Sequence, residues 1–261
     1  MQPELLLFDI GNTCIKLGLA DTSGLGETWS LPTRMPHTAD SLGLALAGLL
    51  GGAGLGRGDF AVCAVCSVVP DLTPVLRDAV GRYLACPVLN FPEDFAPGLE
   101  NRYDHPGQVG ADRLLAAFAA RRLFPEQASL ISVDFGTATT FDCVTGDAYL
   151  GGLICPGVLS SHGALATGTA KLPRISLEVD ADAPLIGSNT STSMRHGFVF
   201  GFAAMTEGLC ARLRMQLPGP CLVIGTGGFA QAIAAVSACL DHVRPDLILE
   251  GLRLAWKQSR S

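Results

Sequence analysis

Two aspartates, Asp9 and Asp134, each end an apolar segment and stand just before a glycine turn rich in hydroxyl groups. Asp9 lies in LLLFDIGNTCIK and Asp134 in LISVDFGTATTFD. A carboxylate at a strand end can hold Mg²⁺, and a glycine lets backbone N–H groups approach phosphate oxygens. Hydroxyl groups such as those of Thr13 and Thr137 can donate hydrogen bonds to the same oxygens. Both turns therefore favour metal–phosphate chemistry.

The repetition of the pattern strengthens this interpretation. Either turn alone could be an ordinary hairpin whose acid has no function. The two acids, however, lie 134 − 9 = 125 residues apart, close to half of the 261-residue chain. Each is embedded in a strand–turn–strand–turn–strand pattern, which is typical of a duplicated domain. Two such turns, one from each copy, are predicted to face each other across a cleft and to clamp a triphosphate.

A third glycine turn, in CLVIGTGGFAQAIAA, joins an apolar strand to a helix. Its glycines at 225, 227 and 228 would let a flat base or ribose rest on the backbone. A dinucleotide-binding turn could look similar, although the fingerprint spacing is missing. The P-loop, the protein-kinase signatures and the GxSxG and HExxH motifs are also missing from the sequence.

Asp112 has two possible roles. It follows Gly110 and Ala111 at the start of a helical pattern, where an acid complements the helix dipole. It could instead be a general base held rigidly beside the substrate. Position alone favours the helix-start role. Arg113 and Tyr103 lie nearby in the sequence and could recognise an anionic substrate that carries a hydroxyl group.

Composition limits the class of protein. Hydrophobic residues make up 48% of the chain and charged residues 16%, which suits a large buried core. The net charge of −6 argues against a broad nucleic-acid interface. No apolar run reaches the ~20 residues needed to cross a bilayer, and MQPELLLFD lacks a basic leader segment. We therefore expect a cytoplasmic protein that binds neither membranes nor nucleic acid.

The nine cysteines are scattered and odd in number, which is typical of free thiols in a reducing compartment. Cys63 and Cys66 form a CxxC pair that could serve zinc or redox chemistry. No second pair and no histidine stands near them in the sequence, so a buried strand is the favoured interpretation.

Alternating strand and helix patterns predict an α/β fold. Helical spacing is found at 40–50, 71–84, 111–124, 197–217 and 231–240, and further short strands are expected at 60–69, 87–91 and 221–228. We expect two domains, 1–124 and 125–261, with the boundary between the helix at 112–124 and the strand at 130–135.

Several motifs together resemble the type III pantothenate kinase family. They are, in chain order, DIGNTCIK, PGQVGADRLLAAFAA, VDFGTATTFDCV, YLGGLICPG, TAKLP, IGSNTSTSMRHG, TGGFA and PDLILEGL. The resemblance implies two duplicated ribonuclease H-like domains of the acetate kinase, sugar kinase, Hsp70 and actin superfamily, with ATP in the cleft between them. It implies ATP-dependent phosphorylation of pantothenate to 4′-phosphopantothenate, the first step of coenzyme A biosynthesis. It also implies a homodimer that requires Mg²⁺ and a monovalent cation, K⁺ or NH₄⁺.

The resemblance also implies roles for individual residues. Asp112 would be the proton acceptor, and Asp134 would hold the monovalent cation, although the residues alone suggested Mg²⁺ there. The residues expected to bind ATP are Asp9, Ile10, Gly11, Asn12, Thr13, Cys14, Ile15, Lys16 and Thr137. Those expected to bind pantothenate are Tyr103, Gly110, Ala111, Asp112, Arg113 and Thr190. The alternative function is a regulatory, transcription-accessory protein that retains the same fold.

Overall fold

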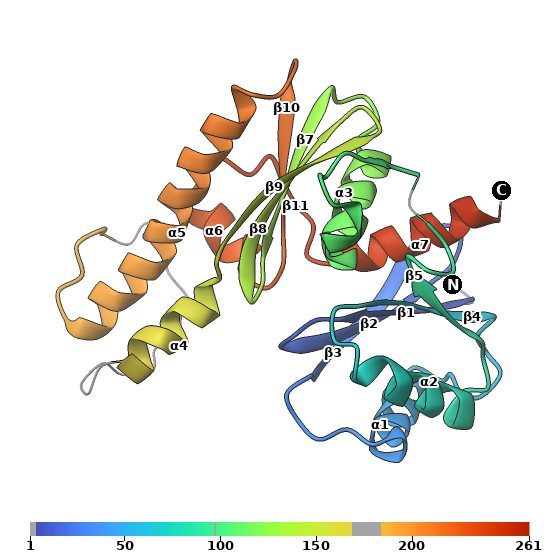
Figure 1. The fold of residues 1–261 in the computed structure, drawn as a ribbon. Coiled ribbons are helices and arrows are strands. Elements are labelled where there is room, and N and C mark those ends of the chain that lie inside the picture. Colours follow the sequence, from blue (N-terminus) through green and yellow to red (C-terminus); the bar gives the residue numbers. More distant parts are fainter. Residues whose placement is uncertain (1–3, 97, 169–183, 261) are drawn as a thin grey trace. The chain divides into compact units, whose positions relative to one another are not determined.

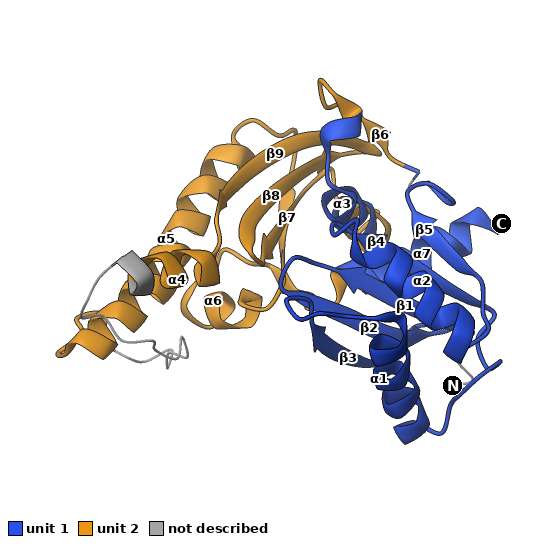
Figure 2. Cartoon of the chain, turned by 60° about the horizontal axis from the view of Figure 1, so that its bottom comes forward, with its two compact units in different colours: residues 1–98, 107–119, 248–261 blue, residues 99–106, 120–247 orange. Residues whose placement is uncertain are grey.

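The computed structural model describes residues 4–96, 98–168 and 184–260, and it divides the chain into two compact units (Figure 2). Unit 1 comprises residues 1–98, 107–119 and 248–261, and unit 2 comprises residues 99–106 and 120–247. The TAKLP motif at 169–173 lies outside the described residues. Among the helices that are described, none is long and apolar enough to span a membrane.

Unit 1 is built on a five-stranded sheet with the order β3-β2-β1-β4-β5. The first three strands form an antiparallel meander, and β4 and β5 continue it in parallel to β1. Their bounds are Leu5–Ile10 for β1, Cys14–Ala20 for β2, Leu25–Pro32 for β3, Val62–Ser67 for β4 and Val88–Phe91 for β5. Because β1 and β4 lie in the middle of the sheet, their sequences read as almost continuous apolar runs.

Helices cover both faces of this sheet. Helices α1 (Ala39–Gly52) and α2 (Leu72–Tyr83) pack on one face, where Phe8 and Leu17 meet Leu46 in the core (Figure 1). On the other face, α7 (Leu247–Ser259) brings Leu249 within 3.0 Å of the place where a Cβ on Gly18 would stand. Gly18 therefore lets the last helix of the chain pack closely on the second strand.

Unit 2 repeats the same topology. Its six-stranded sheet has the order β11-β10-β7-β8-β9-β6, in which β7, β8 and β9 form the antiparallel meander and β10 and β11 run parallel to β7. The strand bounds are Glu100–Asn101 (β6), Ser129–Phe135 (β7), Ala138–Thr145 (β8), Ala148–Pro156 (β9), Cys221–Thr226 (β10) and His242–Val243 (β11). Since β1-β2-β3-β4-β5 and β7-β8-β9-β10-β11 match one for one, the predicted α/β fold with two duplicated sheets is confirmed.

The helices of unit 2 are α4 (Val158–Gly168), α5 (Thr190–Arg214) and α6 (Ala230–Val236). Ile131, Phe135 and Val223 of the sheet form one core with Ala203 of α5 and Ile233 of α6. The helix α3 (Ala111–Leu123) begins in unit 1 and ends in unit 2, because residues 107–119 belong to the first and 120–247 to the second.

The bounds of two helices differ from the sequence prediction for local reasons. Helix α5 begins at Thr190, ahead of the predicted 197, because Asn189 and Thr192 form a reciprocal capping box. Helix α6 ends at Val236, short of the predicted 240. The next residue, Ser237, is extended and donates a hydrogen bond of 2.7 Å to Glu207 of α5.

The two units also trace the chain differently from the expected domains 1–124 and 125–261. The C-terminal helix α7 is grouped with the first sheet, and residues 99–106, which include β6, are grouped with the second. The predicted boundary between residues 124 and 125 separates the two copies of the sequence repeat, and it stays a prediction.

Candidate active site

The turn between β1 and β2 has its backbone fixed and its tip exposed. The Gly11 N–H donates to the Cys14 carbonyl (3.0 Å), and a Cβ on Gly11 would stand 3.3 Å from that oxygen. From the end of the meander, the Thr33 hydroxyl donates to the Gly11 carbonyl (2.7 Å) and its N–H to the Thr13 carbonyl (3.1 Å). Asn12 and Thr13 are exposed at the tip. The turn is therefore a rigid loop whose polar side chains face the solvent.

Asp9 lies on β1, directly opposite Lys16 of β2 and Cys66 of β4. Residues that stand opposite each other in a sheet share a face. Asp9 and Lys16 thus share the face opposite to α1 and α2, since the neighbouring Phe8 and Ile10 are buried in the core beneath those helices. A half-buried carboxylate and an ammonium group side by side suit a site for a metal and phosphates.

Asp112 lies in the first turn of α3, and its Oδ1 accepts a hydrogen bond of 2.8 Å from the Arg113 N–H. A Cβ on Gly110 would stand only 2.4 Å from the same Oδ1, so a larger residue there would displace the Asp112 carboxylate. Burial raises the pKa of the Asp112 carboxyl, and the Arg113 N–H and guanidinium partly oppose this. A carboxylate with a raised pKa is a better proton acceptor than an ordinary aspartate.

Asp9 and Asp112 are 103 residues apart in the sequence (112 − 9), but the charges of both act on one thiol in unit 1, that of Cys66. Burial raises the pKa of Cys66 well above its ordinary value, and the negative charges of Asp9, Asp112 and Glu93 raise it further. Asp9 stands opposite Cys66 in the sheet, and the charges of Asp112 and Glu93 also reach this thiol. The general-base role of Asp112 stays a prediction.

Cys63 and Cys66 both lie in β4 as the sequence predicted, and both are free and buried. Cys63 belongs to the apolar core under α1 and α2. The CxxC pair is thus part of a central strand, in which Cys66 stands opposite Asp9. Sequence reasoning missed Glu93, because a single acid after a short strand carries no recognisable signal.

Asp134 in unit 2 is enclosed by two glycine turns. It lies on β7, opposite Thr140 of β8 and Thr226 of β10. A Cβ on Gly227, whose φ is +85°, would stand 2.2 Å from the Asp134 Oδ1, and one on Gly136 would stand 3.5 Å from it. The turn after β10 thus packs against the Asp134 carboxylate, and two motifs that are 92 residues apart (226 − 134) form one local structure.

The turn that contains Thr137 is held by the start of α4. The Gly136 N–H donates to the Ala138 carbonyl (3.0 Å), and Ser160 donates to the Thr137 carbonyl (2.6 Å). A Cβ on Gly157 would stand 2.1 Å from that carbonyl oxygen, so the chain needs glycine where it enters α4. The position of the Thr137 turn therefore depends on the YLGGLICPG motif.

The Asp134 carboxylate stands opposite two hydroxyl-bearing residues, Thr140 and Thr226. Oxygen atoms of this kind are the ligands that hard cations take in proteins. Within residues 4–96, 98–168 and 184–260, no group of three or more His, Cys, Asp or Glu side chains is arranged to hold a metal ion.

The remaining candidate residues lie in different places. Arg113 is buried beside Asp112 in unit 1. Tyr103 belongs to unit 2, where its ring lies against Gly151 and Tyr149. Thr190 is the first residue of α5 and opens on a cavity of about 610 Å³. The lining of that cavity comes from α4 and α5 and includes Leu165, Ser193, Met194, Gly197 and Phe198.

Two solved structures share the fold of this chain at low sequence identity. A Campylobacter jejuni protein named for the Baf family of transcriptional activators superposes with a TM-score of 0.61, at 18% identity and with 98% of each chain covered. The inorganic polyphosphate/ATP-glucomannokinase of Arthrobacter sp. strain KM superposes with a TM-score of 0.51, at 15% identity, with 99% of this chain and 100% of the other covered. These likenesses concern the fold alone.

Sequence comparison identifies the family. The model of the type III pantothenate kinase family matches residues 5–212. A protein of Oleidesulfovibrio alaskensis named type III pantothenate kinase is 60% identical over 259 residues, which cover 99% of this chain and 98% of the relative. The match takes in the Asp9, Asp112 and Asp134 turns described above. The chain belongs to the type III pantothenate kinase family.

Proposed function

We propose that this protein is a kinase that transfers the γ-phosphoryl group of ATP to the primary alcohol of pantothenate and so produces 4′-phosphopantothenate, at the start of coenzyme A biosynthesis. The observation that carries the proposal is that Asp9, with Lys16 directly opposite it, lies in the same unit as Asp112, and that the charges of both aspartates act on Cys66. A carboxylate for Mg²⁺ and an ammonium group for phosphate are thereby combined with a candidate proton acceptor. The family membership supports the same substrate and reaction.

Phosphoryl transfer requires mainly alignment and charge neutralisation, with little covalent work from the protein. In our proposal, residues Asp9 to Lys16 and Thr137 line the phosphates of ATP. Mg²⁺, bound through carboxylate and phosphate oxygens, would neutralise the charge of the triphosphate. Asp112 accepts the proton of the attacking alcohol, and its raised pKa suits that role. Gly110, through its missing Cβ, leaves the space that Oδ1 of Asp112 occupies.

We assign pantothenate binding to Tyr103, to Gly110 through Arg113, and to Thr190. Arg113 is a cation beside the proton acceptor, and it can pair with the substrate carboxylate or with a phosphate. The assay that tests the function follows ADP release with ATP, Mg²⁺ and K⁺, with and without pantothenate. We expect release that depends on pantothenate. A folded sample that releases no ADP above the background without pantothenate would refute the proposal.

A monovalent cation at Asp134 is the second part of the proposal. We expect activity to collapse when Na⁺ replaces K⁺ or NH₄⁺, because cavity size and ligand number discriminate between cations. The measurement is turnover in the chloride salts of the three cations at constant ionic strength. In the Asp134→Asn variant, adding K⁺ should increase turnover much less than it does in the wild-type enzyme. Equal rates in all three salts would show that Asp134 is not a monovalent-cation site.

We also propose a homodimer in the cytoplasm. The family resemblance supports the dimer, and the nine free cysteines support a reducing compartment. Light scattering at micromolar concentration should give twice the mass of the 27.2 kDa chain, and a monomeric mass would contradict the dimer. The regulatory alternative is favoured only by the name of the Campylobacter jejuni protein, whose 18% identity concerns fold alone.

A further inference from the structure

One face of the unit 2 sheet carries a row of polar side chains. Asp134 of β7 stands opposite Thr140 of β8, and Ser132 stands opposite Asp142. The alternate residues of these strands form the apolar core under α5 and α6. The row therefore extends from the Asp134 turn into the middle of the sheet, and Asp142 is its innermost carboxylate.

Asp142 is only 1% exposed and forms a hydrogen bond with Tyr149, which is fully buried. The Tyr149 hydroxyl donates to Oδ1 of Asp142 over 2.8 Å, and the Thr140 hydroxyl donates to Oδ2 over 3.4 Å. Burying a carboxylate is costly even when it is hydrogen-bonded. Two apolar side chains of the same shape would stabilise the core at least as well as Asp142 and Tyr149. The presence of this polar pair is therefore better explained by a function.

The ring of Tyr149 supports Tyr103. The two ring centroids are 6.4 Å apart with an interplanar angle of 37°. Gly151, at φ +99°, makes room on the other side, because a Cβ there would stand 3.0 Å from the Tyr103 ring. The contact is a close one, and any larger residue at position 151 would push the Tyr103 ring away.

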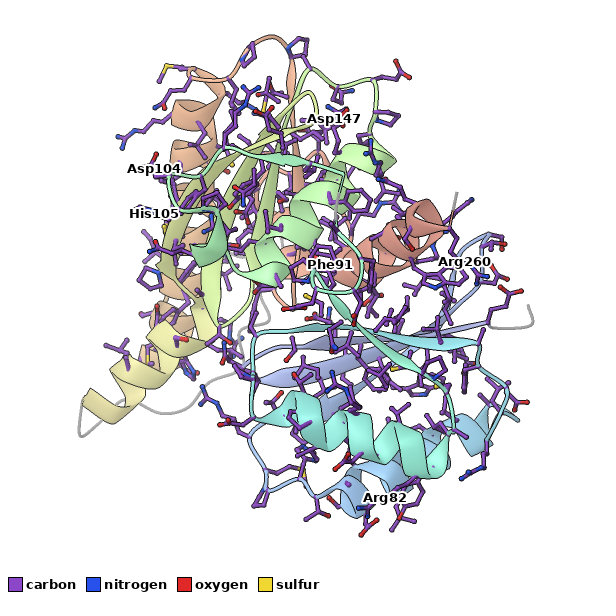
Figure 3. All side chains as sticks on the ribbon, turned by 45° about the vertical axis from the view of Figure 1, so that its right-hand side comes forward. Arg82, Phe91, Asp104, His105, Asp147 and Arg260 are labelled. Carbon is purple, nitrogen blue, oxygen red and sulfur yellow. The ribbon has the colours of Figure 1, made fainter. Side chains whose placement is uncertain are left out.

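The backbone around Tyr103 is fixed as well. The short strand β6 pairs with β9, with Asn101 opposite Tyr149. The Arg102 N–H donates to the Tyr149 carbonyl (2.9 Å), and the Tyr103 N–H donates to the Asn101 side chain (3.1 Å). The next two residues, Asp104 and His105, are exposed (Figure 3). Tyr103 itself is half-buried, and its ring packs against Tyr149.

We infer that Asp142 and Tyr149 are positioning residues that hold the Tyr103 ring where it binds pantothenate. Asp142 holds the Tyr149 hydroxyl through a hydrogen bond. The Tyr149 ring packs against the Tyr103 ring, and Gly151, which has no side chain, leaves space for the Tyr103 ring. The inference rests on the proposed function, because Tyr103 is there assigned to the substrate. It extends that function by two buried residues that need not touch the substrate themselves.

The test compares Tyr149→Phe with the wild-type enzyme. The change removes one hydroxyl and keeps the ring, so the fold should survive. Loss of a hydrogen bond to a charged group predicts a rise of about tenfold in the KM for pantothenate, with kcat and the KM for ATP within about twofold. Tyr83→Phe is the matched control, because Tyr83 also donates to an aspartate, Asp40, in an exposed part of unit 1. Its KM values should not change.

A second variant tests the pair. Asp142→Ala should raise the same KM. The double variant should be no worse than Asp142→Ala alone, because Asp142→Ala already removes the bond from Tyr149, together with the one from Thr140. A lower melting temperature with an unchanged pantothenate KM in Tyr149→Phe would show a purely structural role and would overturn the inference.

Hydrogen exchange separates this inference from the proposed function. Amides of residues 100–103 should exchange several-fold faster in Tyr149→Phe than in Tyr83→Phe, since the strand that carries Tyr103 loosens. A wild-type protein that does not turn over pantothenate would refute the proposed function. The hydrogen-exchange rates would then still show whether Tyr149 holds Tyr103 in position. Unchanged exchange in Tyr149→Phe would overturn the positioning of Tyr103, whatever the activity.

Discussion

Replacing Asp112 with asparagine should lower kcat by about 10²–10⁴-fold and leave the fold intact. Asparagine keeps the shape of the side chain but cannot accept the proton of the alcohol. The protein should not lose stability, because burial already raises the pKa of Asp112 and a neutral amide avoids the cost of that buried charge. The measurement pairs steady-state kinetics with thermal melting and with ATP binding.

The matched control is Asp71→Asn. Asp71 stands at the N-cap of α2, is exposed and makes no capping hydrogen bond through its side chain. Its replacement alters only an exposed helix-start charge, so turnover should stay unchanged. If Asp112→Asn retained more than about a tenth of the wild-type kcat, Asp112 would be a helix-start acid after all, and the proton would leave by another route.

The pH dependence of the wild-type enzyme should agree. Because the pKa of Asp112 is raised by burial, protonation of this carboxyl begins at a higher pH than for an ordinary aspartate. The value of kcat/KM should therefore be at its maximum above the pKa of Asp112 in the folded protein, and it should fall as the pH drops through that pKa. Asp112→Asn should lack this acid limb.

Replacing Gly227 with alanine should lower turnover by about 10²-fold through displacement of Asp134. The new Cβ would stand 2.2 Å from the Asp134 Oδ1, where it cannot remain, and a φ of +85° adds strain for any residue with a Cβ. Either the carboxylate or the glycine turn must move. Kinetics at saturating K⁺ and across a K⁺ titration would measure the effect, and the apparent affinity for K⁺ should weaken.

Gly208→Ala, in helix α5 of the same unit, provides the control. A Cβ on Gly208 would meet no atom within 4 Å, and the residue is not in the left-handed region. Activity and K⁺ response should therefore stay within about twofold, since exposed substitutions of this kind change little. Equal effects of the two variants would mean that the contact between Gly227 and Asp134 has no part in catalysis.

Local patterns in the sequence were enough to predict the sheets. The runs that became β1 and β7 end on an acid and a glycine turn, and this repeated pattern predicted two copies of one α/β topology. The buried interior of β4 also followed from its apolar sequence, against the zinc or redox interpretation of Cys63 and Cys66.

Features that depend on long-range register were not predictable. Cys66 lies beside Asp9 only because β4 pairs with β1 in that register, and nothing in the sequence reveals that the charges of Glu93 and Asp112 act on the same thiol. The strand β6 has two residues, too few for a periodic signal, yet it carries Tyr103 to β9. Likewise, no local pattern tells that α7 packs on Gly18.

The most direct test of the account is to identify the product. Phosphorus NMR of a reaction with ATP, Mg²⁺, K⁺ and pantothenate should show a phosphomonoester signal that grows as the γ-phosphate signal of ATP declines, in equal amounts. The same reaction with Asp112→Asn should show neither change on that timescale. Inorganic phosphate in place of the phosphomonoester, or no loss of ATP in the wild-type reaction, would contradict the assignment of this chain as a pantothenate kinase.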